Sequence, residues 1–229
     1  MEAIVLAAGL GTRLRPYTLK KPKPLLAVQG RPILDWTLGA LPKQVERVLV
    51  VVHYLGEQVE DYLRQQKHFS QWQVVRQETP RGTGDAVLAC RKHIRSPQFL
   101  VLNGDDLFAV ADLAKLADCS AGVLCHPVDE PRRFGIAFRK ADGTLDRLVE
   151  KPDLDGRYLA NTGAYVFPRD VFDIPLTLSP RGEYEVTQYV HELAKRQAVQ
   201  VIEASHWLPI GTVEVWQAAQ TSDLKPFLA

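Results

Sequence analysis

The sequence predicts an α/β protein with a doubly wound, mostly parallel sheet and a more antiparallel second part. In the first half of the chain, short β-branched runs alternate with longer amphipathic stretches. The strand candidates there are almost continuously apolar, as is typical of parallel strands that are buried on both faces. In the second half, short apolar runs follow one another with a turn sequence at Asp142–Gly143, which favours antiparallel pairing.

The first half of the chain contains four predicted strands and three predicted helices. Strands are expected at residues 3–7, 47–53, 72–77 and 99–104. Helices are expected at residues 32–41, 56–66 and 84–94. The first of these helices has Pro32 in its first turn, where a missing N–H is tolerated.

The second half of the chain contains five predicted strands and two predicted helices. Strands are expected at residues 122–128, 135–139, 145–151, 159–167 and 199–204. Helices are expected at about 183–196 and at 213–223, and the first of them has an apolar stripe of Val186, Tyr189, Val190 and Leu193. Because no repeat or long linker interrupts the pattern, residues 1–229 are predicted to form a single domain.

The composition excludes several classes of protein. Lys and Arg total 28 against 27 Asp and Glu, so a general nucleic-acid or membrane electrostatic footprint is not expected. Three cysteines without C-x-x-C spacing argue against a disulfide framework and a structural zinc site. The apolar residues 3–8 are too few for a membrane span, and no basic region precedes them. A cytoplasmic protein is therefore expected.

Three polar or glycine-rich segments come directly after predicted strands. Gly9–Arg13 follows the first strand, Gln77–Thr83 follows the third, and Asp105–Asp106 follows the fourth. In open α/β sheets, ligands bind outside the carboxyl ends of the strands. We therefore expect the three segments to converge on one cleft.

The first of these segments has the composition of an anion-binding loop. Its glycines allow backbone N–H groups to approach a ligand, and Lys23 follows between two prolines after four other nearby cations, Arg13, Arg15, Lys20 and Lys21. A dinucleotide fingerprint would need glycine where this chain has Leu14, and a Walker A loop would need a Gly-Lys-Ser/Thr that is missing. The two common phosphate loops are thus excluded.

What remains is the pattern A-A-G-x-G-T-R-L-x-P-x-T followed by K-P-K-P-L. With it, the chain resembles the nucleotidyltransferases that activate sugar 1-phosphates, such as glucose-1-phosphate thymidylyltransferases and uridylyltransferases. Seven further short motifs follow in the family's order: Q-x-x-P-x-G-T-G at 77–84, N-G-D at 103–105, F-G-I at 134–136, V-E-K-P at 149–152, N-T-G at 161–163, G-E-Y-E-V-T at 182–187 and I-G-T at 210–212.

The resemblance implies a fold and a reaction. The fold is Rossmann-like, of the nucleotide-diphospho-sugar transferase type, with residues 1–110 mainly binding nucleotide and residues 111–229 mainly binding the sugar phosphate. In the reaction, a sugar 1-phosphate such as glucose 1-phosphate attacks the α-phosphorus of dTTP or UTP, giving a nucleotide sugar and pyrophosphate. A phosphate monoester with a second pKa of about 6 is already largely dianionic at neutral pH, so no general base is needed.

The resemblance also implies roles at the nucleotide end. Arg13 would hold the triphosphate and neutralise the leaving group, Lys23 would meet the α-phosphate and the incoming sugar phosphate, and Asp105 would bind Mg²⁺. Gln77 would read the edge of the base, and Gly82 would let the base approach the backbone. The full set of expected nucleotide-binding residues is Leu6, Ala8, Gly9, Leu10, Gly11, Thr12, Gln77, Gly82 and Thr83.

At the sugar end, Gly135, Glu150 and Asn161 match positions that bind sugar hydroxyls, and Lys151 matches the residue that holds the sugar phosphate. The chain departs from the family where most relatives have a second acidic metal ligand, because that position is Pro209. The neighbouring Asp106 is the alternative second ligand. Gln188 is a smaller departure, at a position where relatives often have Asp.

Two other functions remain open from the sequence. One is a CTP-dependent cytidylyltransferase that acts on phosphocholine or another alcohol phosphate. The other is a catalytically silent nucleotide-sugar-binding domain, which Pro209 suggests and the intact Arg13, Lys23 and Asp105 oppose. The expected partners are a nucleoside triphosphate and a sugar 1-phosphate, without nucleic acid or membrane, and the oligomeric state stays open.

Overall fold

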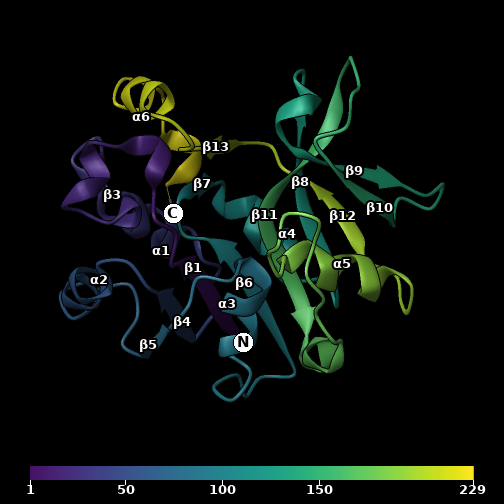
Figure 1. Ribbon diagram of the computed structural model, residues 1–229, viewed down its shortest axis with the longest axis horizontal. Helices are drawn as coiled ribbons and strands as arrows, with labels where there is room; N and C mark the ends of the chain where they lie inside the picture. The colour runs from purple at the N-terminus through teal and green to yellow at the C-terminus, as the bar shows by residue number, and fades with distance from the viewer. Residues whose placement is uncertain (229) are drawn as a thin grey trace.

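The computed structural model describes residues 1–228 and is built around one nine-stranded sheet (Figure 1). Seven strands follow one another in the order β10-β9-β11-β6-β1-β4-β5, and β8 joins β11 to β12 beside them. The strands of this sheet are β1 (Glu2–Ala7), β4 (Arg47–Val52), β5 (Trp72–Arg76), β6 (Gln98–Asn103), β8 (Gly122–Val128), β9 (Gly135–Arg139), β10 (Leu145–Glu150), β11 (Tyr158–Pro168) and β12 (Gln200–Glu203).

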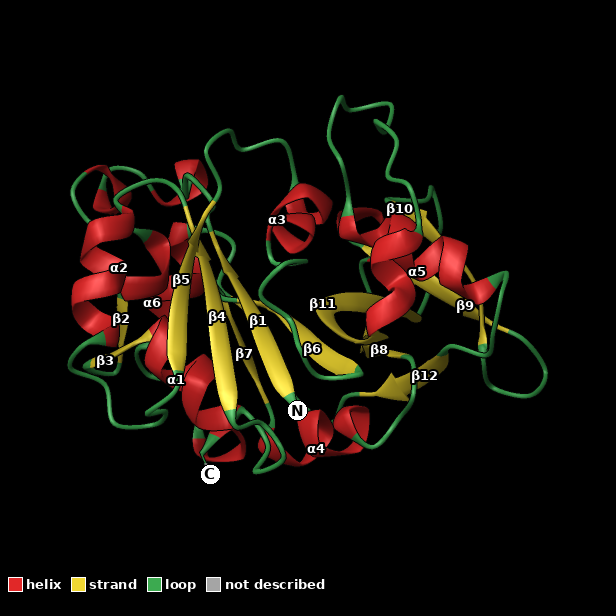
Figure 2. Cartoon of the chain, turned by 90° about the horizontal axis from the view of Figure 1, so that it is seen from below, coloured by secondary structure: helices red, strands yellow, loops and turns green. Residues whose placement is uncertain are grey.

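The strands β6, β1, β4 and β5 are parallel and lie side by side (Figure 2). Every residue of β1 is buried, and its side chains alternate between two apolar clusters. Ile4 and Leu6 pack with helices α3 (Thr83–Ala89) and α5 (Val186–Ala194). Ala3, Val5 and Ala7 pack on the other face with α1 (Ile33–Ala40), α2 (Gly56–Leu63) and α4 (Val110–Ala117). Helices on both faces confirm the predicted doubly wound sheet.

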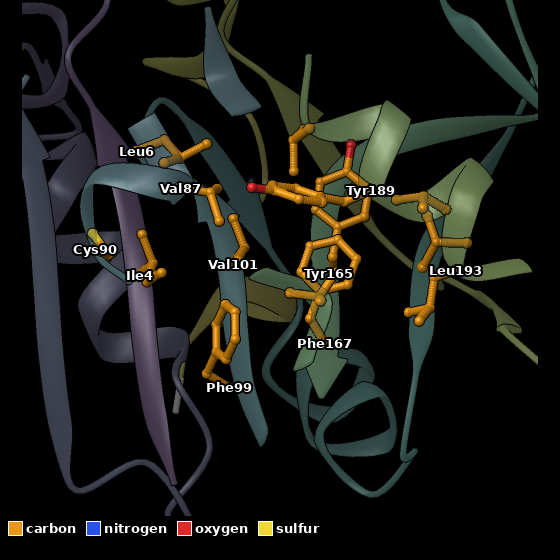
Figure 3. Close-up of a cluster of buried hydrophobic side chains, with 14 of the residues drawn as sticks. Ile4, Leu6, Val87, Cys90, Phe99, Val101, Tyr165, Phe167, Tyr189 and Leu193 are labelled. Atoms are coloured by element: carbon orange, nitrogen blue, oxygen red, sulfur yellow. The ribbon is translucent and has the colours of Figure 1, made fainter. Parts of the chain in front are cut away.

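The second half of the chain adds the antiparallel part of the sheet. The long strand β11 pairs antiparallel with β6, β8 and β9, so it joins the parallel strands to the rest. Strands β9 and β10 form a hairpin, and β12 pairs parallel with β8. Figure 3 shows the aromatic side chains Phe99, Tyr165, Phe167 and Tyr189, which pack together where β6, β11 and α5 meet.

The predicted strands are confirmed, while all five predicted helices are shorter than expected, including α6 (Val213–Ala219). No element was predicted for residues 105–121, although α4 lies there. That helix begins after Ala109 without a side-chain cap, so its sequence carries no start signal. Four strands of two or three residues and six 3₁₀ helices were also not predicted: β2 (Ala27–Val28), β3 (Arg31–Pro32), β7 (Asp106–Phe108), β13 (Trp207–Pro209), η1 (Thr12–Leu14), η2 (Tyr17–Leu19), η3 (Lys23–Leu25), η4 (Pro131–Arg133), η5 (Arg169–Asp173) and η6 (Lys225–Phe227).

No helix within residues 1–228 is both long enough and apolar enough to cross a bilayer.

Candidate active site

A glycine-rich loop leads from the carboxyl end of β1 into η1. Gly11 has φ +61°, and a Cβ there would press on Thr18 and Lys23. The Thr18 hydroxyl donates a hydrogen bond of 2.8 Å to the Gly11 carbonyl oxygen, which fixes the loop against the segment that carries Lys23. The N–H groups of Leu10 and Gly11 donate no backbone hydrogen bond within residues 1–228, so they are available to a ligand.

This loop borders a cavity of about 190 Å³. Its lining confirms that the first and third of the predicted strand-end segments converge, because Asp105 after β6 faces the loop after β1. Gly211 joins it from the second half of the chain, whereas no residue of the second strand-end segment lines it. The expected nucleotide-binding residues that do not line it are Ala8, Leu10, Gln77, Gly82 and Thr83. The lining consists of Leu6, Ala7, Gly9, Gly11, Thr12, Arg13, Leu14, Lys23, Pro24, Asp105 and Gly211.

Lys23 and Asp105 form an ion pair at this cavity, with 2.5 Å between Lys23 Nζ and Asp105 Oδ2. The Lys23 side chain is buried, whereas that of Asp105 is 36% exposed. Arg13 is exposed and forms no ion pair within residues 1–228. A phosphate entering the cavity would therefore meet one free guanidinium and one ammonium group that a carboxylate now neutralises.

Asp106 does not line the cavity. Its side chain is buried, and its Oδ2 accepts a hydrogen bond of 3.4 Å from Trp207 Nε1. Burial, together with the nearby charge of Asp105, raises the pKa of Asp106 to about 8. Pro209 lies opposite Asp106 in the β7–β13 pair. Asp105 is thus the one carboxylate that lines the cavity, and no cluster of three metal-ligating side chains exists within residues 1–228.

The turn after β5 holds Gln77 in one orientation. The side-chain nitrogen of this buried residue donates to the Gly82 carbonyl oxygen at 3.1 Å and to Asp85 Oδ2 at 2.8 Å. Because both partners can only accept, the amide nitrogen must face them. The Gln77 Oε1 atom accepts no hydrogen bond within residues 1–228, so it remains free to bind a ligand donor.

The structure gives Gly82 a different purpose from the one expected. We expected glycine here to let a base approach the backbone, but the space that a Cβ would take is filled by the backbone of Tyr184. Gly82 also has φ +114°. Around it, Tyr184 N–H donates to the Arg81 carbonyl oxygen and Gly84 N–H donates to the Tyr184 carbonyl oxygen, both at 2.8 Å.

Thr83 takes part in the same junction. Its hydroxyl oxygen accepts a hydrogen bond of 3.0 Å from the N–H of Val186, the first residue of α5. We call the contact between residues 81–84 and 184–186 the backbone bridge. It fixes the turn after β5 against the start of α5, and neither Gly82 nor Thr83 lines the glycine-loop cavity.

A second cavity, of about 400 Å³, lies over the antiparallel part of the sheet. Three of the four residues expected at the sugar end line it, namely Gly135, Glu150 and Asn161. Lys151 is exposed and does not line it. Of the other lining residues, Glu185 and Thr187 belong to the G-E-Y-E-V-T motif and Gln188 is the departure noted beside it. Sequence reasoning did not identify the rest, which are Leu148, Thr177, Leu178, Ser179, Pro180 and His191.

Arg181 was also missed by sequence reasoning. Its guanidinium contacts Glu185 at 3.0 and 3.1 Å and Glu150 at 3.4 Å, and thus bridges two carboxylates that line the second cavity. These carboxylates and hydrogen bonds keep the pKa of Arg181 above its usual value although burial acts in the opposite direction. One sequence feature could have indicated Arg181, namely its position directly before the G-E-Y-E-V-T run.

Comparison with known proteins identifies one matching family and several similar proteins. The family described as nucleotidyl transferase matches residues 2–225. The bifunctional protein GlmU of Methanococcus aeolicus is 37% identical over 216 residues, which cover 92% of this chain and 51% of that protein. The UTP–glucose-1-phosphate uridylyltransferase AglF of Haloferax volcanii is 31% identical over 226 residues, with 93% of both proteins covered. The chain thus spans about half the length of GlmU relatives.

Solved structures share the fold. A putative glucose-1-phosphate thymidylyltransferase from Bacillus anthracis, in complex with a sucrose, superposes with a TM-score of 0.82 at 27% identity, covering 99% of this chain and 98% of that one. A UDP-glucose pyrophosphorylase in complex with UDP-glucose gives a TM-score of 0.81 at 22% identity, covering 96% of each chain. At the latter identity the likeness concerns the fold alone.

Proposed function

This chain belongs to the nucleotidyl transferase family, and from that premise we propose that it transfers a nucleotidyl group from UTP or dTTP to a sugar 1-phosphate, with glucose 1-phosphate or a similar sugar as the acceptor. The observation that carries the proposal is the glycine-loop cavity, where Arg13, Lys23 and Asp105 meet after two neighbouring parallel strands. Two cations and one carboxylate in a single cavity suit the binding of a triphosphate whose α-phosphorus is attacked by the phosphate of a second substrate.

The nucleotide end is suited to phosphoryl positioning rather than to proton transfer. The free N–H groups of Leu10 and Gly11 would bind phosphate oxygens, and Arg13 would neutralise the departing pyrophosphate. Lys23 would release Asp105 and contact the α-phosphate, where it also meets the incoming sugar phosphate. The nucleophile needs no base because it is already an anion.

Asp105 is the residue that would hold Mg²⁺. Its carboxylate lines the cavity and is partly exposed, whereas Asp106 is buried against Trp207 and Pro209 has no ligating side chain. Mg²⁺ is commonly bound by one or two carboxylates together with substrate phosphates and water, so a single carboxylate fits a metal that arrives with the nucleotide. When bound, the ion would neutralise charge on the triphosphate.

The free Oε1 atom of Gln77 supports a uracil or thymine base. These bases carry an imide N–H that can donate to it, whereas cytosine has an unprotonated acceptor nitrogen at the same ring position. This chemistry disfavours the CTP-dependent alternative. It does not distinguish UTP from dTTP, which differ in a methyl group and a ribose hydroxyl.

The second cavity supports a sugar as the acceptor. Glu150 and Asn161 supply a carboxylate and an amide on one wall, and both can hydrogen-bond to hydroxyl groups. Lys151 follows directly after this wall, and Arg181 bridges Glu150 to Glu185 at its edge. We propose that these two cations approach the phosphate of the sugar 1-phosphate.

The first test is pyrophosphate release from five nucleoside triphosphates (ATP, GTP, CTP, UTP and dTTP), with and without Mg²⁺. The acceptors are glucose 1-phosphate, other neutral, amino and N-acetylamino sugar 1-phosphates, and phosphocholine. We expect Mg²⁺-dependent release with UTP or dTTP and at least one sugar 1-phosphate. Release with CTP and phosphocholine alone would replace the proposal by the cytidylyltransferase hypothesis. Nucleotide binding without any turnover would favour the silent binding domain.

A further inference from the structure

Strand β11 contains a bulge between Asn161 and Ala164. On the neighbouring strand β8, these two residues lie opposite Cys125 and Leu124, so β11 advances by three residues where β8 advances by one. Gly163 sits in the bulge with φ +80°, and a Cβ there would clash with the side-chain amide of Asn103. The glycine therefore permits both the left-handed backbone and the close approach of β6.

The bulge brings Asn161 close to Tyr165. On a regular strand, residues four apart would be separated by about 13 Å along the chain. Here Asn161 and Tyr165 lie opposite Cys125 and Val123, which are two positions apart on β8. Their side chains therefore share one face of the sheet at a spacing of about 7 Å.

Asn161 is held at both ends of its amide. Its Nδ2 donates a hydrogen bond of 2.7 Å to the Tyr165 hydroxyl oxygen, and its Oδ1 accepts one of 3.1 Å from Gly163 N–H. A flipped amide would place Nδ2 against the Gly163 N–H, donor against donor. One Nδ2 proton and one Oδ1 lone pair remain for a ligand in the second cavity, and the donor and the acceptor keep the same positions.

Tyr165 is itself fixed. It is 1% exposed, and its ring stacks on Phe167 with 5.5 Å between the centroids and 10° between the planes (Figure 3). Burial raises the pKa of the Tyr165 hydroxyl well above its usual value, so the group stays neutral. The hydroxyl thus offers Asn161 a constant, buried acceptor beneath the cavity wall.

We propose that Tyr165 is a positioning residue for Asn161 and holds its amide nitrogen in place, so that the amide meets the sugar in the orientation that Gly163 N–H sets. The inference rests on the proposed function, in which Asn161 binds a sugar hydroxyl. Tyr165 does not line the cavity, so it acts through Asn161. Its removal should weaken sugar binding without changing the nucleotide site.

The test compares Tyr165→Phe with a matched control, Tyr189→Phe. Tyr189 is also buried and also packs on Phe167, with 6.3 Å between the ring centroids, but its hydroxyl has no hydrogen-bond partner within residues 1–228. Tyr165→Phe should raise KM for the sugar 1-phosphate about fivefold to tenfold and change KM for the nucleotide by less than about twofold. Tyr189→Phe should leave both constants within about twofold of wild type.

A double-mutant cycle with Asn161→Ala separates positioning from a structural role. If Tyr165 acts through Asn161, adding Tyr165→Phe to Asn161→Ala should change KM for the sugar 1-phosphate by less than about twofold. Two results would overturn the inference. In one, Tyr165→Phe raises KM for the sugar 1-phosphate as much in the Asn161→Ala protein as in the wild type. In the other, Tyr165→Phe alone leaves that KM at its wild-type value. The midpoint of thermal unfolding and the KM for the nucleotide show whether the Tyr165→Phe variant keeps its structure. A general loss of structure would change both.

The two levels of proposal fail in different ways. If wild-type protein turns over a sugar 1-phosphate but Asn161→Ala leaves its KM unchanged, the role of Asn161 is wrong and the positioning inference falls, while the proposed function stands. If wild-type protein turns over none of the sugar 1-phosphates, the proposed function falls and the inference falls with it.

Discussion

Arg13 offers the most direct test at the scale of a single residue. Its guanidinium is exposed, lines the glycine-loop cavity and has no ion pair within residues 1–228. If it neutralises the leaving pyrophosphate, Arg13→Ala should lower kcat by about 10²- to 10³-fold, and Arg13→Lys should retain part of the rate. Steady-state pyrophosphate release measures both. An unchanged kcat in Arg13→Ala would remove Arg13 from the mechanism.

Glu2 is a buried carboxylate whose role concerns stability. Its Oε2 accepts from the N–H groups of Arg95 and Ser96 at 2.6 and 2.8 Å, and its Oε1 accepts from Arg47 at 2.7 Å. Burial alone would raise the pKa of Glu2, but these hydrogen bonds outweigh it and the pKa lies below the usual 4.5. Glu2 therefore stabilises the fold above pH 4.5, and that stabilisation is lost as pH falls through the lowered pKa.

Glu2→Gln should accordingly lower the free energy of unfolding by about 1–3 kcal/mol at pH 7. The difference from wild type should shrink as pH falls from 4.5 through the lowered pKa, since wild-type Glu2 then loses the charge that the glutamine amide never has. Urea denaturation at pH 7, 5, 4 and 3 measures both effects. A difference that stays constant over this range would show that the charge of Glu2 is not what stabilises the fold.

Individual site residues were predictable to different degrees. Asp105 could be placed beside the glycine loop because both follow neighbouring parallel strands, and strand order is encoded in apolar runs. Arg181 could not be found in this way, because its contact with Glu150 joins positions 31 residues apart through the folding of a loop. The roles assigned to the site residues remain predictions until activity is measured.

At the scale of elements, the turn that begins α3 depends on Gly82. A Cβ at this position would clash with the Tyr184 carbonyl oxygen, and φ +114° is unfavourable for any other residue. Gly82→Ala should lower the free energy of unfolding by roughly 2–4 kcal/mol and weaken the backbone bridge.

Thermal unfolding and amide hydrogen exchange at residues 81–84 and 184–186 check the Gly82→Ala prediction. Gly143→Ala is a suitable control, because Gly143 also has positive φ, at +83°, but a Cβ added there would meet no atom of residues 1–228 within 4 Å. Comparable losses of stability in the two variants would attribute the cost to backbone conformation alone, and not to contact with Tyr184.

The elements that sequence alone predicted are those with a long apolar run or a strong helical periodicity. The buried strands β1, β4 and β6 each have at least four buried residues in a row, which only a two-sided core explains. The pair β7–β13 could not be predicted, because three-residue strands carry no periodicity. Its position matters for the site, since it places Pro209 opposite Asp106.

At the scale of the whole molecule, metal and nucleotide should stabilise the protein together. Asp105 is already paired with Lys23, so Mg²⁺ alone should shift the midpoint of thermal unfolding by less than about 1 °C. UTP or dTTP with Mg²⁺, at about 100 times the dissociation constant, should raise it by about 5–10 °C. Differential scanning calorimetry with each ligand alone and with both tests this coupling. A large shift with Mg²⁺ alone would point to a preformed metal site.

The division into a nucleotide half and a sugar half remains a prediction, and the sites cross that boundary. Gly211 from the second half lines the glycine-loop cavity. Tyr184 packs against the turn that holds Gln77 and Gly82. The second half therefore completes the surroundings of the nucleotide end, and separating the chain near residue 110 would remove parts of them.

The backbone bridge has a consequence for how the protein is made. The Val186–Thr83 hydrogen bond joins residues 103 positions apart, and contacts of such separation form late because a long loop must close first. During synthesis, β1, β4 and β5 can assemble while the turn after β5 still lacks its partners. That turn acquires its final shape only once residues 184–186 have left the ribosome, so Gln77, whose amide is held by the same turn, gains its final surroundings late in synthesis.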